Sequence, residues 1–136
     1  MKLRWWLPGL MLVLLWGVSA AQAQRRGWKP ICLEYKKGAL LVDVRTLREV
    51  KATPVKGATH IPLSVIQRNP LVIKAWLKKQ KKSKTPIIFF CHSGGRSGLA
   101  VMMVKAVGLK KVYNGGEYTI WQKIKPRKQL VCKDNP

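Results

Sequence analysis

The chain has 136 residues, with 27 Lys and Arg against 5 Asp and Glu, so its formal net charge is +22. This length suits one domain with a real core and excludes two complete ones. An apolar fraction of 47% argues against disorder, so we expect a small and very basic globular protein.

The first 23 residues have the pattern of a cleavable export signal. Lys2 and Arg4 are followed by an uncharged apolar stretch over 7–18, and residues 21–23 form an A-x-A cleavage site. The alternative is an uncleaved membrane anchor, which Pro8 and Gly9 make less suitable. We therefore expect a signal peptide over 1–23, a domain over 24–136, a periplasmic location and no stable membrane insertion after cleavage.

Export changes the interpretation of the cysteines, because oxidising compartments favour disulfides. Cys32 and Cys132 lie near the two ends of the expected domain, whereas Cys91 lies alone in the middle. An odd count leaves one thiol unpaired. We expect a disulfide between Cys32 and Cys132 that ties the two ends together, with two free thiols as the alternative.

Apolar runs and helical patterns alternate along the first half of this domain. Residues 39–44 form a short apolar run typical of a buried parallel strand, and Thr46 is placed to cap a short helix over 47–52. A brief strand follows at 60–62. The pair at 69–70 starts a surface helix whose core face carries Ile73, Trp76 and Leu77.

The second half continues the alternation. Residues 86–90 are the strongest strand candidate and are expected to be central. The run over 97–107 is apolar nearly all round, which predicts a helix packed inside, ended by Gly108. A short strand at 111–113, a turn at 115–116 and a helix over 117–123 that buries Trp121 complete the pattern.

The chemistry is concentrated in the loop between the central strand and the helix after it. Its residues are Cys91, His92, Ser93, Gly94, Gly95, Arg96 and Ser97. A glycine-containing loop of this kind can point successive backbone N–H groups at one atom, and the positive end of the helix dipole lies on the same side. Together with Arg96, these groups are expected to lower the pKa of Cys91 and to supply a nucleophilic thiolate.

At this point the chain resembles the single-domain rhodaneses, the thiosulfate sulfurtransferases, and in size and leader the small periplasmic members. The family's active loop, C-x-x-G-x-R-S, corresponds to Cys91, Gly94, Arg96 and Ser97. Residues 41–45 resemble the family's D-V-R strand end, residues 57–62 its G-A-x-x-I-P turn, and residues 114–116 its late G-G turn. The resemblance implies an α/β fold with a mostly parallel sheet flanked by helices.

It also implies sulfur transfer from thiosulfate or a similar anionic donor through a Cys91 persulfide. Backbone N–H groups of residues 92–97 would hold the persulfide, and Arg96 would bind the departing sulfonate oxygens or brace the loop. The acceptor would be cyanide, a thiol or a protein. No metal or organic cofactor is required, and Asp43 and Arg45 are expected to be structural.

Two other classes of function stay open. Cysteine phosphatases also hold a thiolate in an amide-lined loop, but their C-x5-R spacing is one residue longer than the interval from Cys91 to Arg96. The second alternative is a basic anion-binding module, because every charged residue between Glu49 and Glu117 is a lysine or arginine. We do not expect nucleic acid as its physiological partner, and the sequence does not indicate the oligomeric state.

Overall fold

The computed structural model describes residues 27–133, and the expected signal peptide over 1–23 lies outside the described residues. Its centre is one four-stranded sheet in the order β2-β1-β3-β4, with every neighbouring pair parallel. The strands are β1 (Leu40–Asp43), β2 (Thr59–His60), β3 (Ile87–Cys91) and β4 (Val112–Glu117). The predicted fold class is therefore confirmed, with β3 an inner strand.

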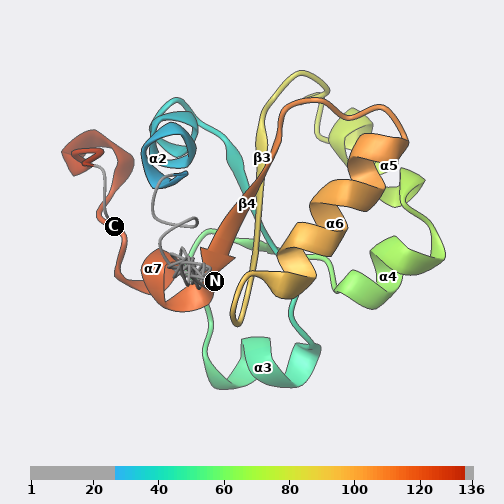
Figure 1. Cartoon of the computed structure of the whole chain (residues 1–136), viewed down its shortest axis with the longest axis horizontal. Coiled ribbons are helices and arrows are strands. Elements are labelled where there is room, and N and C mark those ends of the chain that lie inside the picture. Colours follow the sequence, from blue (N-terminus) through green and yellow to red (C-terminus); the bar gives the residue numbers. More distant parts are fainter. Residues whose placement is uncertain (1–26, 134–136) are drawn as a thin grey trace, which may run out of the picture.

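Helices cover both faces of the sheet (Figure 1). On one face lie α4 (Leu63–Arg68), α5 (Leu71–Lys79) and α6 (Gly95–Ala106), and on the other lie α2 (Trp28–Lys36) and α7 (Tyr118–Lys123). The short α3 (Leu47–Ala52) follows β1, and a 3-10 helix (Arg127–Gln129) precedes the last described residues. None of the helices within 27–133 combines the length and the apolar character needed to cross a bilayer.

The residues of β3 show how one strand builds two cores. Successive side chains of a strand point to opposite faces. Ile87, Phe89 and Cys91 belong to the core under α4, α5 and α6, whereas Ile88 and Phe90 belong to the core under α2 and α7. All five are buried, which explains why the sequence of this strand is a continuous apolar run.

Local signals position the other elements largely as predicted. Thr46 and Glu49 form a reciprocal capping box at the start of α3. Asn69 accepts a hydrogen bond from the backbone N–H of Leu71 at the start of α5, and Ile73 and Leu77 are buried on its core face. Trp121 is buried in α7, and its indole donates to the carbonyl of Gly115 at 2.9 Å.

Three details differ from the sequence-based expectations. The helix after the loop, α6, is not packed inside, since Met102 is 69% exposed. With a single layer of helices on each face of the sheet, only one side of α6 meets the core. Gly115 and Gly116 do not form a turn but lie within β4, where pairing with β3 is irregular between Phe89 and Cys91. Helices α2 and α4 were not predicted at all.

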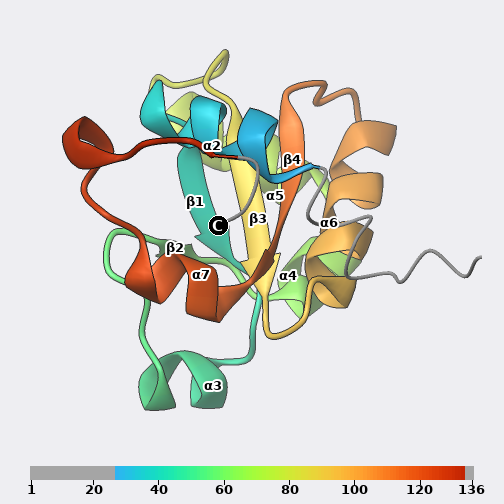
Figure 2. The same cartoon turned by 60° about the vertical axis from the view of Figure 1, so that its left-hand side comes forward.

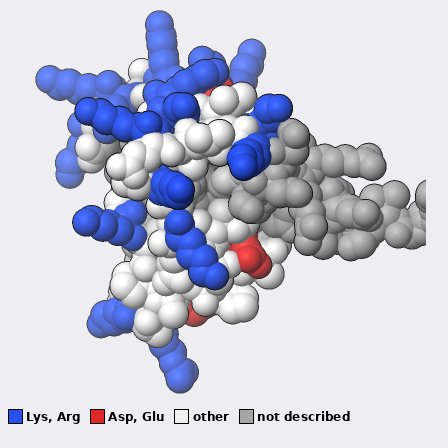
Figure 3. Space-filling view, turned by 90° about the vertical axis from the view of Figure 1, so that its left-hand side faces the viewer, with Lys and Arg blue, Asp and Glu red and all other residues white. Residues whose placement is uncertain are grey.

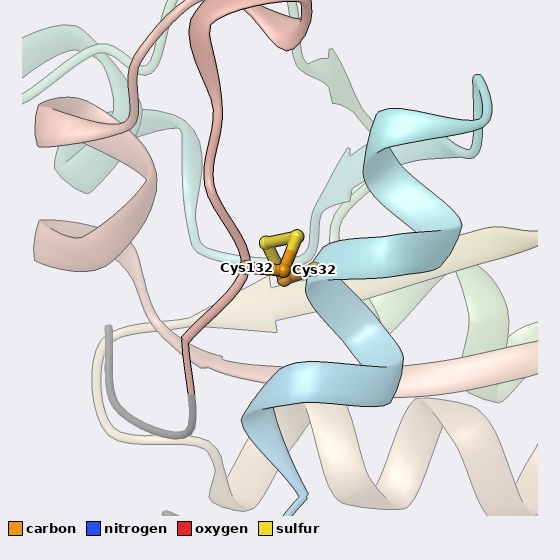
Figure 4. Close-up of a disulfide and its surroundings, with 2 residues drawn as sticks. All are labelled: Cys32 and Cys132. Carbon is orange, nitrogen blue, oxygen red and sulfur yellow. A yellow bond between two sulfur atoms is a disulfide. The ribbon is translucent and has the colours of Figure 1, made fainter.

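The expected disulfide is present between Cys32 of α2 and Cys132, with the two Cα atoms 5.6 Å apart (Figure 4). It closes a sequence separation of 100 residues and joins both ends of the described chain. Cys91 is the free cysteine among the described residues.

We predict that Cys32→Ser and Cys132→Ser each lower thermal stability under oxidising conditions. Each change removes the same cross-link, whose loop is worth up to about 4.7 kcal/mol in the chain-entropy model. The double variant should be no less stable than either single variant, because one cross-link can be lost only once. Thermal melts of the three variants check this, and additive losses would show that the two cysteines stabilise the fold independently.

Candidate active site

Cys91 is the last residue of β3, at the carboxyl edge of the parallel sheet (Figure 2). This edge is where open α/β sheets bind their ligands. The chain turns back at Gly94, whose φ of 95° lies in the left-handed region that glycine adopts most readily. Helix α6 starts at the next residue, Gly95, so the amino end of a twelve-residue helix adjoins the cysteine.

The sulfur of Cys91 is held by hydrogen bonds from the loop that follows it. The backbone N–H of Gly94 donates to Sγ at 3.0 Å, and the hydroxyl of Ser97 lies 3.5 Å from Sγ. Burial raises the pKa of this thiol. The bonds from Ser97 and from the backbone N–H groups of Ser93 and Gly94 outweigh burial, so the net pKa of Cys91 lies below its usual value.

Asn114 of β4 braces the same loop, a contribution that the sequence analysis missed. Its side-chain N–H donates to the carbonyl of Gly94 at 2.9 Å, and its oxygen accepts from Ser97 at 2.7 Å and from the backbone N–H of Gly116 at 3.0 Å. The carbonyl of Gly94 lies 3.0 Å from the same hydroxyl. Because Ser97 has one hydroxyl hydrogen, it donates at any moment to only one of three acceptors: Asn114, Gly94 or the cysteine sulfur. In the sequence, Asn114 stands out only as the first residue of the Asn-Gly-Gly segment at 114–116, and this segment gives no sign of a contact with the loop.

Arg96 is held by a second residue that the sequence analysis did not assign to the site. Its two terminal nitrogens donate to the two carboxylate oxygens of Glu49 at 2.7 and 2.6 Å. The hydrogen bond and charge of Glu49 raise the pKa of Arg96, and the hydrogen bond from Arg96 holds the pKa of Glu49 well below its usual range. Arg96 thus connects the start of α6 to α3, and three of its five N–H bonds are left for other partners.

The remaining loop residues line the outside of the site. His92, Ser93 and Gly95 are exposed, and the ring of His92 lies 5.5 Å from that of Tyr118. These residues therefore present their surfaces to an incoming molecule rather than to the core.

Asp43 and Arg45 form a buried ion pair beneath the site. The pair is bound through several hydrogen bonds, the shortest 2.7 Å, and Arg45 also donates to both oxygens of Thr53. The guanidinium of Arg45 lies 4.4 Å from the ring centre of Tyr118. Both charged residues are only 1–2% exposed, and their polar atoms have hydrogen-bond partners within the protein. This is the arrangement expected of an ion pair with a structural role.

No group of three or more His, Cys, Asp or Glu side chains within 27–133 is arranged to hold a metal ion. The site consists of a cysteine, a set of amide donors, a hydroxyl and one arginine. Such a set can stabilise a thiolate and a second atom or anion bonded next to it.

We predict that Ser97→Ala raises the pKa of Cys91, because it removes the hydroxyl that favours the thiolate. The thiolate is the form present above the pKa, so alkylation by iodoacetamide should slow at neutral pH and its inflection should move to higher pH. Ser93→Ala is the matched control, since Ser93 acts on the sulfur through its backbone N–H alone. Equal inflections in the two variants would contradict the assignment.

Comparison with known proteins places the chain in a family. A model described as a rhodanese-like domain matches residues 22–123. This range covers most of the chain, and the protein belongs to the rhodanese-like domain family, as the sequence motifs indicated.

Individual relatives agree with this assignment. The chain is 31% identical over 90 residues to the human thiosulfate:glutathione sulfurtransferase, a match that covers 61% of this chain and 78% of the human protein. It is also 31% identical over 74 residues to YrkF of Bacillus subtilis, which covers 54% of this chain but only 36% of YrkF. Among solved structures, the human single-domain sulfurtransferase TSTD1 is similar in fold, with a TM-score of 0.51 at 24% identity over 71% of this chain and 93% of TSTD1.

Proposed function

We propose that this protein is a sulfurtransferase that moves a sulfane sulfur from thiosulfate to a thiophilic acceptor through a persulfide on Cys91. The observation that carries the proposal is the hydrogen bonding of Cys91 Sγ by the loop at the end of β3. Membership of the rhodanese-like family supports sulfur transfer in general. The name of the human relative supports thiosulfate as donor and a thiol as acceptor.

The first half-reaction loads the cysteine. The Cys91 thiolate attacks the outer sulfur of thiosulfate, a new S–S bond forms, and the old S–S bond breaks with its electron pair leaving on sulfite. The outer sulfur stays on Cys91 as a persulfide. N–H groups at the start of α6 and the hydroxyl of Ser97 are placed to stabilise the negative charge near it.

The second half-reaction empties the site. The attacking atom of cyanide or of a thiolate bonds to the outer sulfur, and the S–S bond to Cys91 breaks with its electron pair returning to the cysteine. Thiocyanate or a new persulfide leaves, and the thiolate is restored without any external oxidant or reductant. The loop length of four residues between Cys91 and Arg96 suits one added sulfur atom better than a phosphate group.

We further propose that this reaction takes place in the periplasm, after export and cleavage behind Ala23. The support is the basic start, apolar stretch and A-x-A site of residues 1–23. The disulfide between Cys32 and Cys132 also fits an oxidising compartment. Expression with the native leader tests this, because the exported product should begin at Gln24, and a product that begins at Met1 would contradict the proposal.

Arg96→Ala should weaken the binding of thiosulfate. A lost charge-assisted hydrogen bond costs roughly 1.5 to 3 kcal/mol, so the KM for thiosulfate should rise by about one to two decades while persulfide formation persists at high donor concentration. Glu49→Gln keeps a hydrogen-bonding partner for Arg96 and should raise KM less. Steady-state kinetics measure both effects.

Arg68→Ala is the matched control, because Arg68 is an exposed arginine at the end of α4 and outside the loop. Its KM should be unchanged. A normal KM in Arg96→Ala would show that Arg96 only braces the loop.

A further inference from the structure

The end of the sheet opposite Cys91 carries a dense group of lysines. They lie at the end of α5 and in the segments that lead into β3 and β4, so they gather where these strands begin. All are exposed. We define this lysine surface as Lys78, Lys79, Lys81, Lys82, Lys84, Lys110 and Lys111.

The charge of the lysine surface is not neutralised by neighbouring carboxylates. The ion pairs found among the described residues involve Lys37, Arg45 and Arg96, and none uses a lysine of this surface. Figure 3 shows the face that carries α2 and α7, and blue side chains crowd around a red patch at its upper end, the end at which β3 and β4 start in Figure 1. Several unpaired cations therefore share one end of the fold, where their mutual repulsion costs stability unless an anion is bound.

A cavity of about 300 Å³ opens within the lysine surface. Lys84, Lys110 and Lys111 line it together with the polar side chains of Ser83 and Thr85. Leu77, Ile87 and Val112 also line it, and all three are buried. The cavity has room for a single phosphate group near the ammonium groups of the three lysines. Apolar atoms of the same ligand would contact Leu77, Ile87 and Val112.

The backbone at Lys81 gives a second observation. Lys81 has a φ of 53° and is the non-glycine residue with positive φ among the described residues. Helices usually place glycine or asparagine at such a position after their last turn. Glycine would be less strained at this position, so Lys81 adds a charge to the lysine surface at some cost in backbone strain.

We propose that the lysine surface docks the protein onto an anionic phospholipid membrane. Lysine ammonium groups act as point charges toward phosphate, and their spread over one end of the molecule suits a plane of headgroups. Nucleic acid is less suitable, since the residues that line the cavity include neither an arginine for bidentate contacts nor an aromatic side chain for base stacking.

Docking in this way leaves the active site free. β3 runs from the lysine surface to Cys91, and its four intervals span about 13 Å at about 3.3 Å per residue. The loop after Cys91 then faces away from the membrane and stays open to donor and acceptor. This inference stands whether or not the protein transfers sulfur.

The test measures sedimentation of the full chain with vesicles of equal parts phosphatidylcholine and phosphatidylglycerol, and with vesicles of phosphatidylcholine alone. The readout is the ratio of the two partition coefficients, which cancels any contribution of the apolar stretch at 7–18. One variant changes Lys81, Lys82, Lys84 and Lys110 to Gln. Its matched control changes the exposed residues Lys51, Lys56, Lys123 and Lys125 to Gln and has the same net charge.

Each lysine close to an anionic surface contributes about fivefold to binding, and the effect decays over a Debye length of about 8 Å. We expect the ratio to fall by about a hundredfold or more in the lysine-surface variant and far less in the control. Lys81→Gly should lower the ratio while raising the melting temperature, so a loss of binding cannot be attributed to unfolding. Alkylation of Cys91 should proceed equally fast with and without vesicles.

Three results would overturn the proposal. The first is an equal fall of the ratio in the two fourfold variants, which would show only a non-specific response to net charge. The second is protection of Cys91 on the vesicles, because it would place the active face against the membrane. The third is complete displacement of the protein by duplex DNA at an equal phosphate concentration, which would assign the surface to nucleic acid.

Discussion

Cys91→Ser should abolish thiosulfate:cyanide sulfur transfer, with no activity above that of the uncatalysed reaction. A serine hydroxyl cannot form a persulfide, so the covalent intermediate and the ping-pong kinetics disappear together. The side chain of Cys91 is fully buried, and serine differs from cysteine only by oxygen in place of sulfur. The variant should therefore keep its fold, as circular dichroism can verify.

Ser93→Ala is the control for this experiment, because it changes an exposed side chain of the same loop and keeps the backbone N–H in place. It should retain transfer activity. Transfer that persists in Cys91→Ser would refute the proposed nucleophile.

Arg45→Met should produce the largest loss of stability among single substitutions near the site. It leaves the carboxylate of Asp43 buried without its partner, and breaking a buried ion pair in this way costs about 3–5 kcal/mol. Thr53 also loses two hydrogen bonds. Urea denaturation measures the free energy of unfolding.

The double variant Asp43→Asn with Arg45→Met distinguishes the cost of a buried unpaired charge from the cost of the lost packing contacts. Without a buried unpaired charge, it should be more stable than Arg45→Met alone. A loss below about 1 kcal/mol in the single variant would mean that solvent reaches Asp43 and that the pair does not support the edge of the sheet.

The elements that the sequence predicted well are those with strong local signals. Four residues of the predicted strand at 86–90 lie in β3, and they are apolar because β3 is buried on both faces. The capping box at Thr46 marks the start of α3 within the chain itself. Helix α2 lacks such signals. Its N-cap residue, Gly27, has no side chain to cap the helix, and Trp28 and Cys32 are buried in the core under α2 and α7, which the sequence around them does not announce.

Residues of the candidate site that are close in sequence could be predicted, and those that are distant in sequence could not. The loop from Cys91 to Ser97 is contiguous, so its residues could be proposed from spacing alone. Glu49 and Asn114 lie 47 and 20 positions from their partners in the loop, and only the folded sheet brings them together. The apolar content of α6 was also misleading, since it gave no information on how many elements cover that helix.

The most direct test of the account is the intact mass of the exported protein before and after incubation with thiosulfate under non-reducing conditions. We predict a gain equal to the mass of one sulfur atom, located on the peptide that contains Cys91 and lost on addition of cyanide. The same spectrum reports whether the chain begins after Ala23. An unchanged mass, or a wild-type protein that ignores thiosulfate and hydrolyses an aryl phosphate through Cys91, would contradict the assignment of sulfur transfer.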